Sequence, residues 1–283
     1  MQKFLYLTLA FISVARISLI LLPSLEIDIT DYEAWTARLV ELGPTKFYSP
    51  DYFADYFPGY LYMLWFIGNL FNFLFPQMTI FSTDFEHFLK LFTNFFDFGA
   101  AFIIYKIVSR YKRKLGLISA ILYLANPALA FNSSVWGQVD GILAFFLVLT
   151  VYALLELKKP ILFSFLAAVT FLVKPQAIAI FPITLIYLMT NFNYKKYISF
   201  LLLPILLVIL SLPFFLSDPI LGLFHLFQKS TSTYPYNSLY SYNLWALFGW
   251  WIPDTIKYFG ITNQTWGIIL YFLSLTVIIG SLF

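Results

Sequence analysis

Long apolar segments, separated by short polar or basic segments, make up most of the chain. A helix needs about 20 mostly apolar residues to cross a membrane, and many of these segments approach that length. The first is 4–22, which Lys3 precedes and Pro23 follows. The other apolar segments are 57–75, 88–108, 115–131, 141–157, 161–173, 177–189, 197–216 and 267–283. The pattern predicts an all-α polytopic membrane protein.

The first apolar segment is open to two interpretations, a cleaved signal peptide or an uncleaved membrane anchor. Arg16 interrupts the segment, and no cleavage site with small residues follows it. A signal peptide has an uninterrupted apolar region followed by such a site. We therefore expect an uncleaved anchor.

The basic residues predict the orientation of the spans. Lys and Arg concentrate in cytoplasmic loops, and here they gather at Lys3, in 110–114, at 158–159 and at 195–196. All four positions fall on one side only if 57–75 does not cross the membrane. That segment interleaves Tyr and Asn with Phe and Leu, as a helix lying in the interface does. The expected fold is therefore a bundle of about eight transmembrane helices.

This topology places three polar segments outside the cytoplasm: a long first outer loop, 23–86, a turn at 132–140 and a late outer loop, 217–262. Most of the acidic residues fall in these segments, so we expect any chemistry at the outer face. No linker divides the chain, which predicts a single domain over 1–283. Because the chain ends inside an apolar segment, we expect a short form or further spans beyond it.

The composition supports a membrane protein and excludes several other classes. The chain is 61 % hydrophobic and 11 % charged, whereas a soluble domain is about 45–50 % apolar and about 25 % charged. Soluble globular, disordered and nucleic-acid-binding proteins are excluded on this ground. With no Cys and two His residues, the chain has no disulfide, thiolate or multi-His metal chemistry.

The first outer loop carries the main candidate residues, Asp31 and Glu33. A helix is expected to begin near Thr30, with a Thr30–Glu33 capping box, and to end at Leu42 before Gly43. Asp31 would then be the first helical residue, either a general base or a surface carboxylate that compensates the helix dipole. Asp31 and Glu33 also form a relaxed acidic pair that leaves a single divalent ion, Mg²⁺ or Mn²⁺, as a candidate cofactor.

Further polar residues are expected at the same membrane face. They are Asp55, Gln138, Asp140, Lys174 and Gln176, each at a boundary between a loop and an apolar segment. Lys174 either extends to the lipid headgroups or pairs with a lipid phosphate. The same two alternatives hold for Arg16, inside the first span, and there we favour extension to the headgroups.

Five short motifs together resemble the GT-C superfamily of membrane glycosyltransferases, which use polyprenyl-phosphate sugars as donors. The resemblance covers about residues 1 to 250. The motifs are Asp31-Tyr32-Glu33-Ala34, Asp55-Tyr56-Phe57-Pro58-Gly59, Trp136-Gly137-Gln138-Val139-Asp140, Lys174-Pro175-Gln176 and Tyr242-Asn243-Leu244-Trp245. The first is similar to dolichyl-phosphate-glucose glucosyltransferases, and the third and fourth to prokaryotic polyprenyl-phosphate mannosyltransferases. Phe57 departs from the family's usual Pro at that position.

The resemblance implies a GT-C-like bundle whose first outer loop carries juxtamembrane helices. It implies transfer of a hexose, mannose or glucose, to a lipid-linked glycan, lipid or protein acceptor outside the cytoplasm, with inversion and with Asp31 as the base. Glu33, Asp55, Gln138, Asp140, Lys174, Gln176 and Asn243 would bind donor or acceptor. The plasma membrane of a prokaryote is favoured over the endoplasmic reticulum.

Two other classes of function stay open from the sequence. A lipid-sugar flippase or secondary transporter would use ionisable residues deep in the spans, and Asp97 is the candidate for this. A non-catalytic assembly subunit would carry the acidic loop merely as surface. Transport without sugar transfer would favour the first, and wild-type activity after loss of Asp31 the second.

Overall fold

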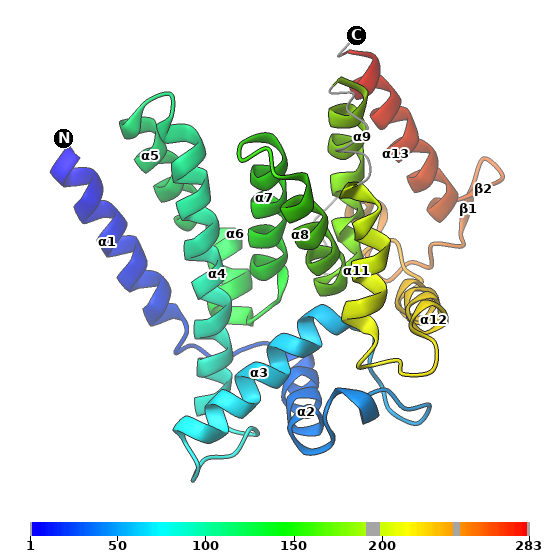
Figure 1. Ribbon diagram of the computed structural model, residues 1–283, viewed down its shortest axis with the longest axis horizontal. Helices are drawn as coiled ribbons and strands as arrows, with labels where there is room; N and C mark the ends of the chain where they lie inside the picture. Colours follow the sequence, from blue (N-terminus) through cyan, green and yellow to red (C-terminus); the bar gives the residue numbers. More distant parts are fainter. Residues whose placement is uncertain (1, 191–198, 240–243, 282–283) are drawn as a thin grey trace. The chain divides into compact units, whose positions relative to one another are not determined.

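The computed structural model describes residues 2–190, 199–239 and 244–281 (Figure 1). The chain is 74 % helical, which confirms the expected all-α class. The sheet found in the described ranges is a small antiparallel pair, β1 (Lys257–Tyr258) and β2 (Ile261–Thr262). Apolar helices therefore make up most of the fold, as the sequence pattern predicts.

Within the described residues, two helices are long and apolar enough to cross a membrane, α4 (Thr83–Ser109) and α13 (Asn263–Gly280). A third span results if α5 (Arg113–Leu124) and the helical segment Pro127–Trp136 are counted together, although the two are bent by 51°. The bend follows Asn126-Pro127, because Pro cannot donate the backbone hydrogen bond that would continue α5. The predicted span 115–131 therefore covers two helical segments with a bend between them, not one straight helix.

Four shorter apolar helical segments match further predicted spans. They are α7 (Asp140–Leu155), α8 (Pro160–Val173), Pro175–Thr190 and α11 (Leu202–Ser211). The third consists of η3 (Pro175–Ile180) and α9 (Phe181–Thr190). The predicted first span is helical over most of its length as α1 (Gln2–Leu19). The basic pair at 195–196 lies outside the described residues.

The predicted first outer loop, 23–86, contains two helices and a turn. These are α2 (Glu26–Leu42), η1 (Pro44–Lys46) and α3 (Pro58–Leu74). Gly43 ends α2 with a φ of 73°, which glycine adopts without strain, and its N–H donates to the carbonyl of Leu39. Pro58 begins α3 at a position where its missing N–H costs nothing. The expected end of α2 at Leu42 is confirmed.

The chain divides into two compact units, Met1–Ile180 with Asn193–Gly222 and Phe181–Phe192 with Leu223–Phe283. In the first unit α2 and α3 lie at one end of the upright helices α7 and α8 (Figure 1). Its core is built from the inward faces of α2 and α3, with Tyr32, Leu39 and Leu64 almost fully buried. The Tyr62 hydroxyl donates to the Leu210 carbonyl at 2.9 Å and so ties α3 to α11.

Close backbone packing joins α3 to α8. A Cβ atom placed on Gly59 would lie 2.6 Å from the backbone oxygen of Leu172 and from the backbone nitrogen of Val173. Real side chains do not tolerate such distances, so α3 approaches the end of α8 only because residue 59 is glycine. This contact places the start of α3 beside Lys174, which directly follows α8.

The second unit holds most of the predicted late outer loop. It contains most of α12 (Pro219–Ser232), then η4 (Leu244–Phe248), the β1–β2 pair and α13. The indole of Trp266 on α13 donates to the Tyr258 carbonyl at 3.0 Å, which ties the helix to the hairpin. This segment is therefore folded rather than an extended loop in the part that the structure describes.

Candidate functional site

Four predicted motifs meet at one end of the first unit, around Tyr32 of α2. The Tyr32 hydroxyl lies 2.9 Å from that of Tyr56 and donates to Oε1 of Gln138 at 3.2 Å. Because Tyr32, Tyr56 and Gln138 come from three different motifs, the contacts bring together segments that are far apart in the sequence. Lys174 belongs to the fourth motif and adds its cation over the Tyr56 ring, 5.6 Å from the centroid.

Lys174 is paired rather than extended toward the headgroups. Its Nζ donates to Oδ1 of Asp140 at 2.6 Å. Burial disfavours the charged form of Lys174, but the neighbouring Tyr56 and Asp140 oxygens outweigh that effect and raise its pKa. Asp140 is exposed and also accepts from the Asn132 amide at 3.3 Å. The site therefore holds a permanently charged ammonium beside an accessible carboxylate.

Asp31 lies half-buried among other carboxylates. Partial burial raises the pKa of Asp31, and the negative charges of Asp55 and Asp28 raise it further. Asp28 is held by the Trp136 indole, whose Nε1 donates to Oδ2 at 2.6 Å. A carboxylate with a raised pKa is a stronger base than an ordinary aspartate, so its surroundings suit Asp31 to accept a proton.

The predicted helix start at Thr30 is wrong. The helix α2 begins at Glu26, and its N-terminal cap, Leu25, makes no side-chain hydrogen bond. Thr30, Asp31 and Glu33 are therefore interior residues, so the Thr30–Glu33 capping box does not form and Asp31 is not the first helical residue. The first four helical residues, 26–29, could not be predicted because no cap residue marks the start of the helix.

Glu33 lies away from the carboxylates around Asp31. Residues two apart on a helix face different sides, and both residues belong to the continuous helix α2. Burial, followed by the negative charge of Glu86, raises the pKa of Glu33 to about 7. Glu86 itself accepts from the backbone N–H of Ser24 at 3.0 Å and from Nζ of Lys90 at 2.9 Å.

The positions of Asp31 and Glu33 on α2 do not favour a metal ion bound by this pair. The described residues contain no group of three or more His, Cys, Asp or Glu side chains placed to hold a metal ion. Asp31 and Glu33 face different sides of α2, so they do not converge on one ion. A divalent ion at Asp31 would need another carboxylate, and Asp28 and Asp55 are the neighbours whose charges Asp31 senses.

The remaining predicted site residues are less informative. Gln176 is exposed, directly after Pro175 in η3. Asn243 lies outside the described residues, so its predicted role is not tested.

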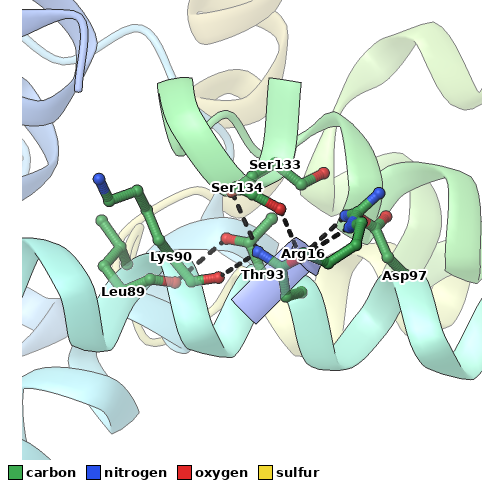
Figure 2. A network of polar contacts seen from close by, with 8 residues as sticks. Arg16, Leu89, Lys90, Thr93, Asp97, Ser133 and Ser134 are labelled. Atoms are coloured by element: carbon green, nitrogen blue, oxygen red, sulfur yellow. Dashed lines mark hydrogen bonds and ion pairs between the residues drawn. The ribbon is translucent and has the colours of Figure 1, made fainter. Parts of the chain in front are cut away.

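The expectation that Arg16 extends to the headgroups is wrong. Arg16 is 1 % exposed and forms an ion pair with Asp97 of α4 (Figure 2). Its Nη2 also donates to Oδ1 of Asn94 at 2.8 Å. A buried guanidinium needs such partners because an isolated charge is very costly away from water. The ion pair therefore lets the charges of Arg16 and Asp97 compensate each other.

Most of this polar cluster on α4 was not predicted from the sequence. Lys90, Asn94 and Asp97 follow one another at helical spacing and are all buried. The Lys90 ammonium donates to the Leu22 carbonyl at 2.6 Å as well as to Glu86. The spacing of these residues could have predicted the cluster, since polar residues four and three apart along an apolar helix lie on one face.

A scan of the chain against protein-family models finds no match, and a search of curated proteins finds none either.

Proposed function

We propose that this protein is an integral membrane glycosyltransferase, which transfers a hexose from a polyprenyl-phosphate donor to an acceptor hydroxyl outside the cytoplasm. The observation that carries the proposal is one continuous polar site. In it the charges of Asp28 and Asp55 act on Asp31. Lys174 pairs with Asp140 and lies over the ring of Tyr56. Transfer from a phosphate-linked sugar requires a base and a cation, and the proposal assigns these roles to Asp31 and Lys174.

The reaction is a single displacement at the anomeric carbon. Asp31 takes the proton of the acceptor hydroxyl as its oxygen forms the new bond to that carbon. The bond from the carbon to the donor phosphate oxygen breaks, and polyprenyl phosphate leaves with the electron pair. Attack opposite the leaving group inverts the configuration. The raised pKa of Asp31 favours this proton transfer.

Lys174 is proposed to stabilise the departing phosphate. Without donor its ammonium is held by Asp140 and lies over the Tyr56 ring. A phosphate oxygen is a strong partner for an ammonium, and charge that grows on the leaving group strengthens the contact in the transition state. Asp140 would thus keep Lys174 in position until the donor phosphate arrives.

A groove beside the site suits a lipid-linked donor. It has a volume of about 270 Å³ and is lined by side chains of four helices, Gly59, Tyr62, Met63, Phe66, Phe92, Val169, Leu172 and Leu210. Gly59 and Leu172 in its lining lie at the contact between α3 and α8, and Lys174 follows α8 directly. Burial of an apolar tail contributes about 0.8 kcal/mol per CH₂, which removes the need for a nucleotide pocket.

The flippase and transporter alternative has less support than the transferase. It relied on Asp97 as an ionisable group deep in a span, and this carboxylate is paired with Arg16. A non-catalytic subunit would leave the raised pKa of Asp31 and the Lys174–Asp140 pair without a role. The proposed topology has eight spans with the site at the outer face, in a prokaryotic plasma membrane.

The test is incubation of the purified protein with polyprenyl-phosphate mannose and glucose, with measurement of donor consumption and product stereochemistry. We expect one donor to be consumed with inversion. Asp31→Asn should lower turnover by about 10²–10⁴-fold, because the amide accepts no proton, while donor binding stays near wild type. Asp51→Asn is the matched control, since Asp51 is an exposed acid of the same loop.

Three outcomes would contradict the proposal. Full turnover in Asp31→Asn would mean that Asp31 is not the base. Loss of turnover in Asp55→Asn with retention in Asp31→Asn would assign that role to Asp55. Transport of donor across liposomes without any transfer of sugar would favour the flippase instead.

A further inference from the structure

The segment 131–140 joins a buried polar cluster to the candidate site. It begins with η2 (Phe131–Trp136), a π-helical turn, and continues through Gly137 into the start of α7. Gly137 has a φ of 85° and lets the chain reverse, so that the Gln138 N–H donates to the Asn132 carbonyl at 3.0 Å. Short π-helical segments are rare and often occur at functional sites.

The beginning of the segment is bound to the cluster that contains Arg16 and α4. The Ser134 hydroxyl donates to Oδ1 of Asn94 at 2.8 Å, and the Asn94 amide donates to the Ser133 carbonyl at 3.3 Å. Arg16 donates to the same Asn94 oxygen and pairs with Asp97 (Figure 2). All five side chains are buried, so water does not compete for these contacts.

The start of α7 is also fitted to this cluster. A Cβ atom on Gly141 would lie 2.5 Å from Oδ1 of Asp97 and 2.7 Å from Oγ of Ser133. Such distances are not tolerated by real side chains, so a larger residue would push Asp97 and Ser133 away. Glycine at 141 therefore permits α4, the π-helical turn and α7 to meet at one point.

The end of the segment supplies three residues to the candidate site. Trp136 donates to Asp28, Gln138 accepts from Tyr32, and Asp140 accepts from Lys174. The same ten residues thus contact the buried cluster through Ser133 and Ser134 and the site through Trp136, Gln138 and Asp140. A displacement of the turn would move these three side chains together.

We propose that Arg16, Asn94 and Asp97 are positioning residues, which hold the π-helical turn so that Trp136, Gln138 and Asp140 meet Asp28, Tyr32 and Lys174. This inference rests on the proposed function for its catalytic consequence. The mechanical part, that the cluster holds the turn, stands on the contacts alone. The two parts are therefore tested by separate measurements.

The first measurement is hydrogen exchange of the backbone amides in Ser134→Ala and Asn94→Leu. Each variant removes contacts to the turn, and exchange in 131–140 should become about three- to tenfold faster, with little change in α8. The matched control is Thr150→Val, which removes a buried hydroxyl that lies 3.0 Å from that of Thr170. Its effect should stay between α7 and α8.

The second measurement is sugar transfer by the same variants. Because a small misplacement of positioning groups is costly, Ser134→Ala and Asn94→Leu should lose about 10- to 100-fold in kcat/KM, and Thr150→Val should lose less than about twofold. A double variant of Ser134→Ala with Trp136→Phe should lose less than the product of the two single losses, since both act through the same segment. A merely structural role would give additive losses.

Unchanged exchange in 131–140 in folded Ser134→Ala would overturn the inference. If Asn94→Leu fails to fold, Ser134→Ala decides alone, since it removes a single hydroxyl. If the wild-type protein transfers no sugar, the proposed function fails, while the exchange measurement still decides whether the cluster holds the turn. Normal transfer together with faster exchange would overturn the catalytic part only.

Discussion

Two carboxylates on α2 differ in their surroundings although they are two residues apart in the sequence. Asp31 lies near Asp28 and Asp55, whereas Glu33 is influenced by Glu86. The helix directs them to different sides, so each side chain has its own electrostatic environment. In the proposed mechanism Asp31 is the base, and Glu33 acts on stability rather than on proton transfer.

The raised pKa of Glu33 predicts that the stability of the folded protein depends on pH. Its pKa is about 7 in the folded protein against a usual value of 4.5. The folded state therefore binds more protons than the unfolded state between these values, and stability falls as the pH rises through this window. Glu33→Gln removes the ionisation, so its thermal unfolding temperature should exceed that of wild type above pH 7 and converge with it below pH 4.5.

The measurement is thermal unfolding of wild-type and variant protein in detergent across this pH range. Glu41→Gln is the control, because it removes one negative charge from an exposed position on the same helix. A difference between Glu33→Gln and wild type that stays constant from pH 4 to 8 would contradict the prediction.

At the scale of elements, the contact between α3 and α8 positions the candidate site. Gly59 allows the start of α3 to pack directly on the backbone at the end of α8. Tyr56 lies three residues before Gly59 on one side of this contact, and Lys174 directly follows Val173 on the other. The separation of these two helices therefore controls the Tyr56–Lys174 contact.

Gly59→Ala tests this role of the packing. Its Cβ atom would meet the Leu172 backbone, which cannot move aside as a flexible side chain could. Overpacking of this kind costs about 1–3 kcal/mol, so the unfolding temperature and the transfer activity should both fall. Gly280→Ala is the control, since a Cβ there meets nothing within 4 Å. Wild-type stability of Gly59→Ala would show that the helices can separate without cost.

At the scale of the whole molecule, the arrangement of the helices relative to the membrane decides where the site faces. The helix α3 lies within the predicted first outer loop, before α4, and was predicted not to cross. If it crossed, the basic residues at 110–114 would lie on the opposite side from Lys3, against the usual distribution of positive charge.

Cysteine labelling tests this topology, because the native chain has no Cys. Thr45→Cys and Gln77→Cys place exposed thiols before and after α3. Both should react with a membrane-impermeant reagent from the non-cytoplasmic side. Lys112→Cys should react only from the cytoplasmic side, which provides the control. Labelling of Thr45→Cys and Gln77→Cys from opposite sides would show that α3 spans the membrane.

Local information in the sequence was sufficient for the class of fold and for most helix positions. Apolar length and turn residues predict α3, α7 and α8 to within a few residues, because backbone hydrogen bonds within a helix depend on neighbouring residues. The polar positions at the ends of apolar segments likewise predicted Gln138, Asp140 and Lys174 at the same membrane face as the first outer loop. In the structure Gln138 contacts Tyr32, and Lys174 lies over the Tyr56 ring and pairs with Asp140. Their roles in binding donor or acceptor stay a prediction.

Only the tertiary structure decided which side chains pair. Arg16 and Asp97 are 81 residues apart, and whether Arg16 extends to the headgroups or is buried depends on which faces of α1 and α4 pack together. Asp31 and Glu33 were interpreted as one acidic pair, but Asp31 is influenced by Asp55 and Asp28, and Glu33 by Glu86. Such pairings arise from the packing of whole helices, and residue types and spacing along a single segment do not specify them.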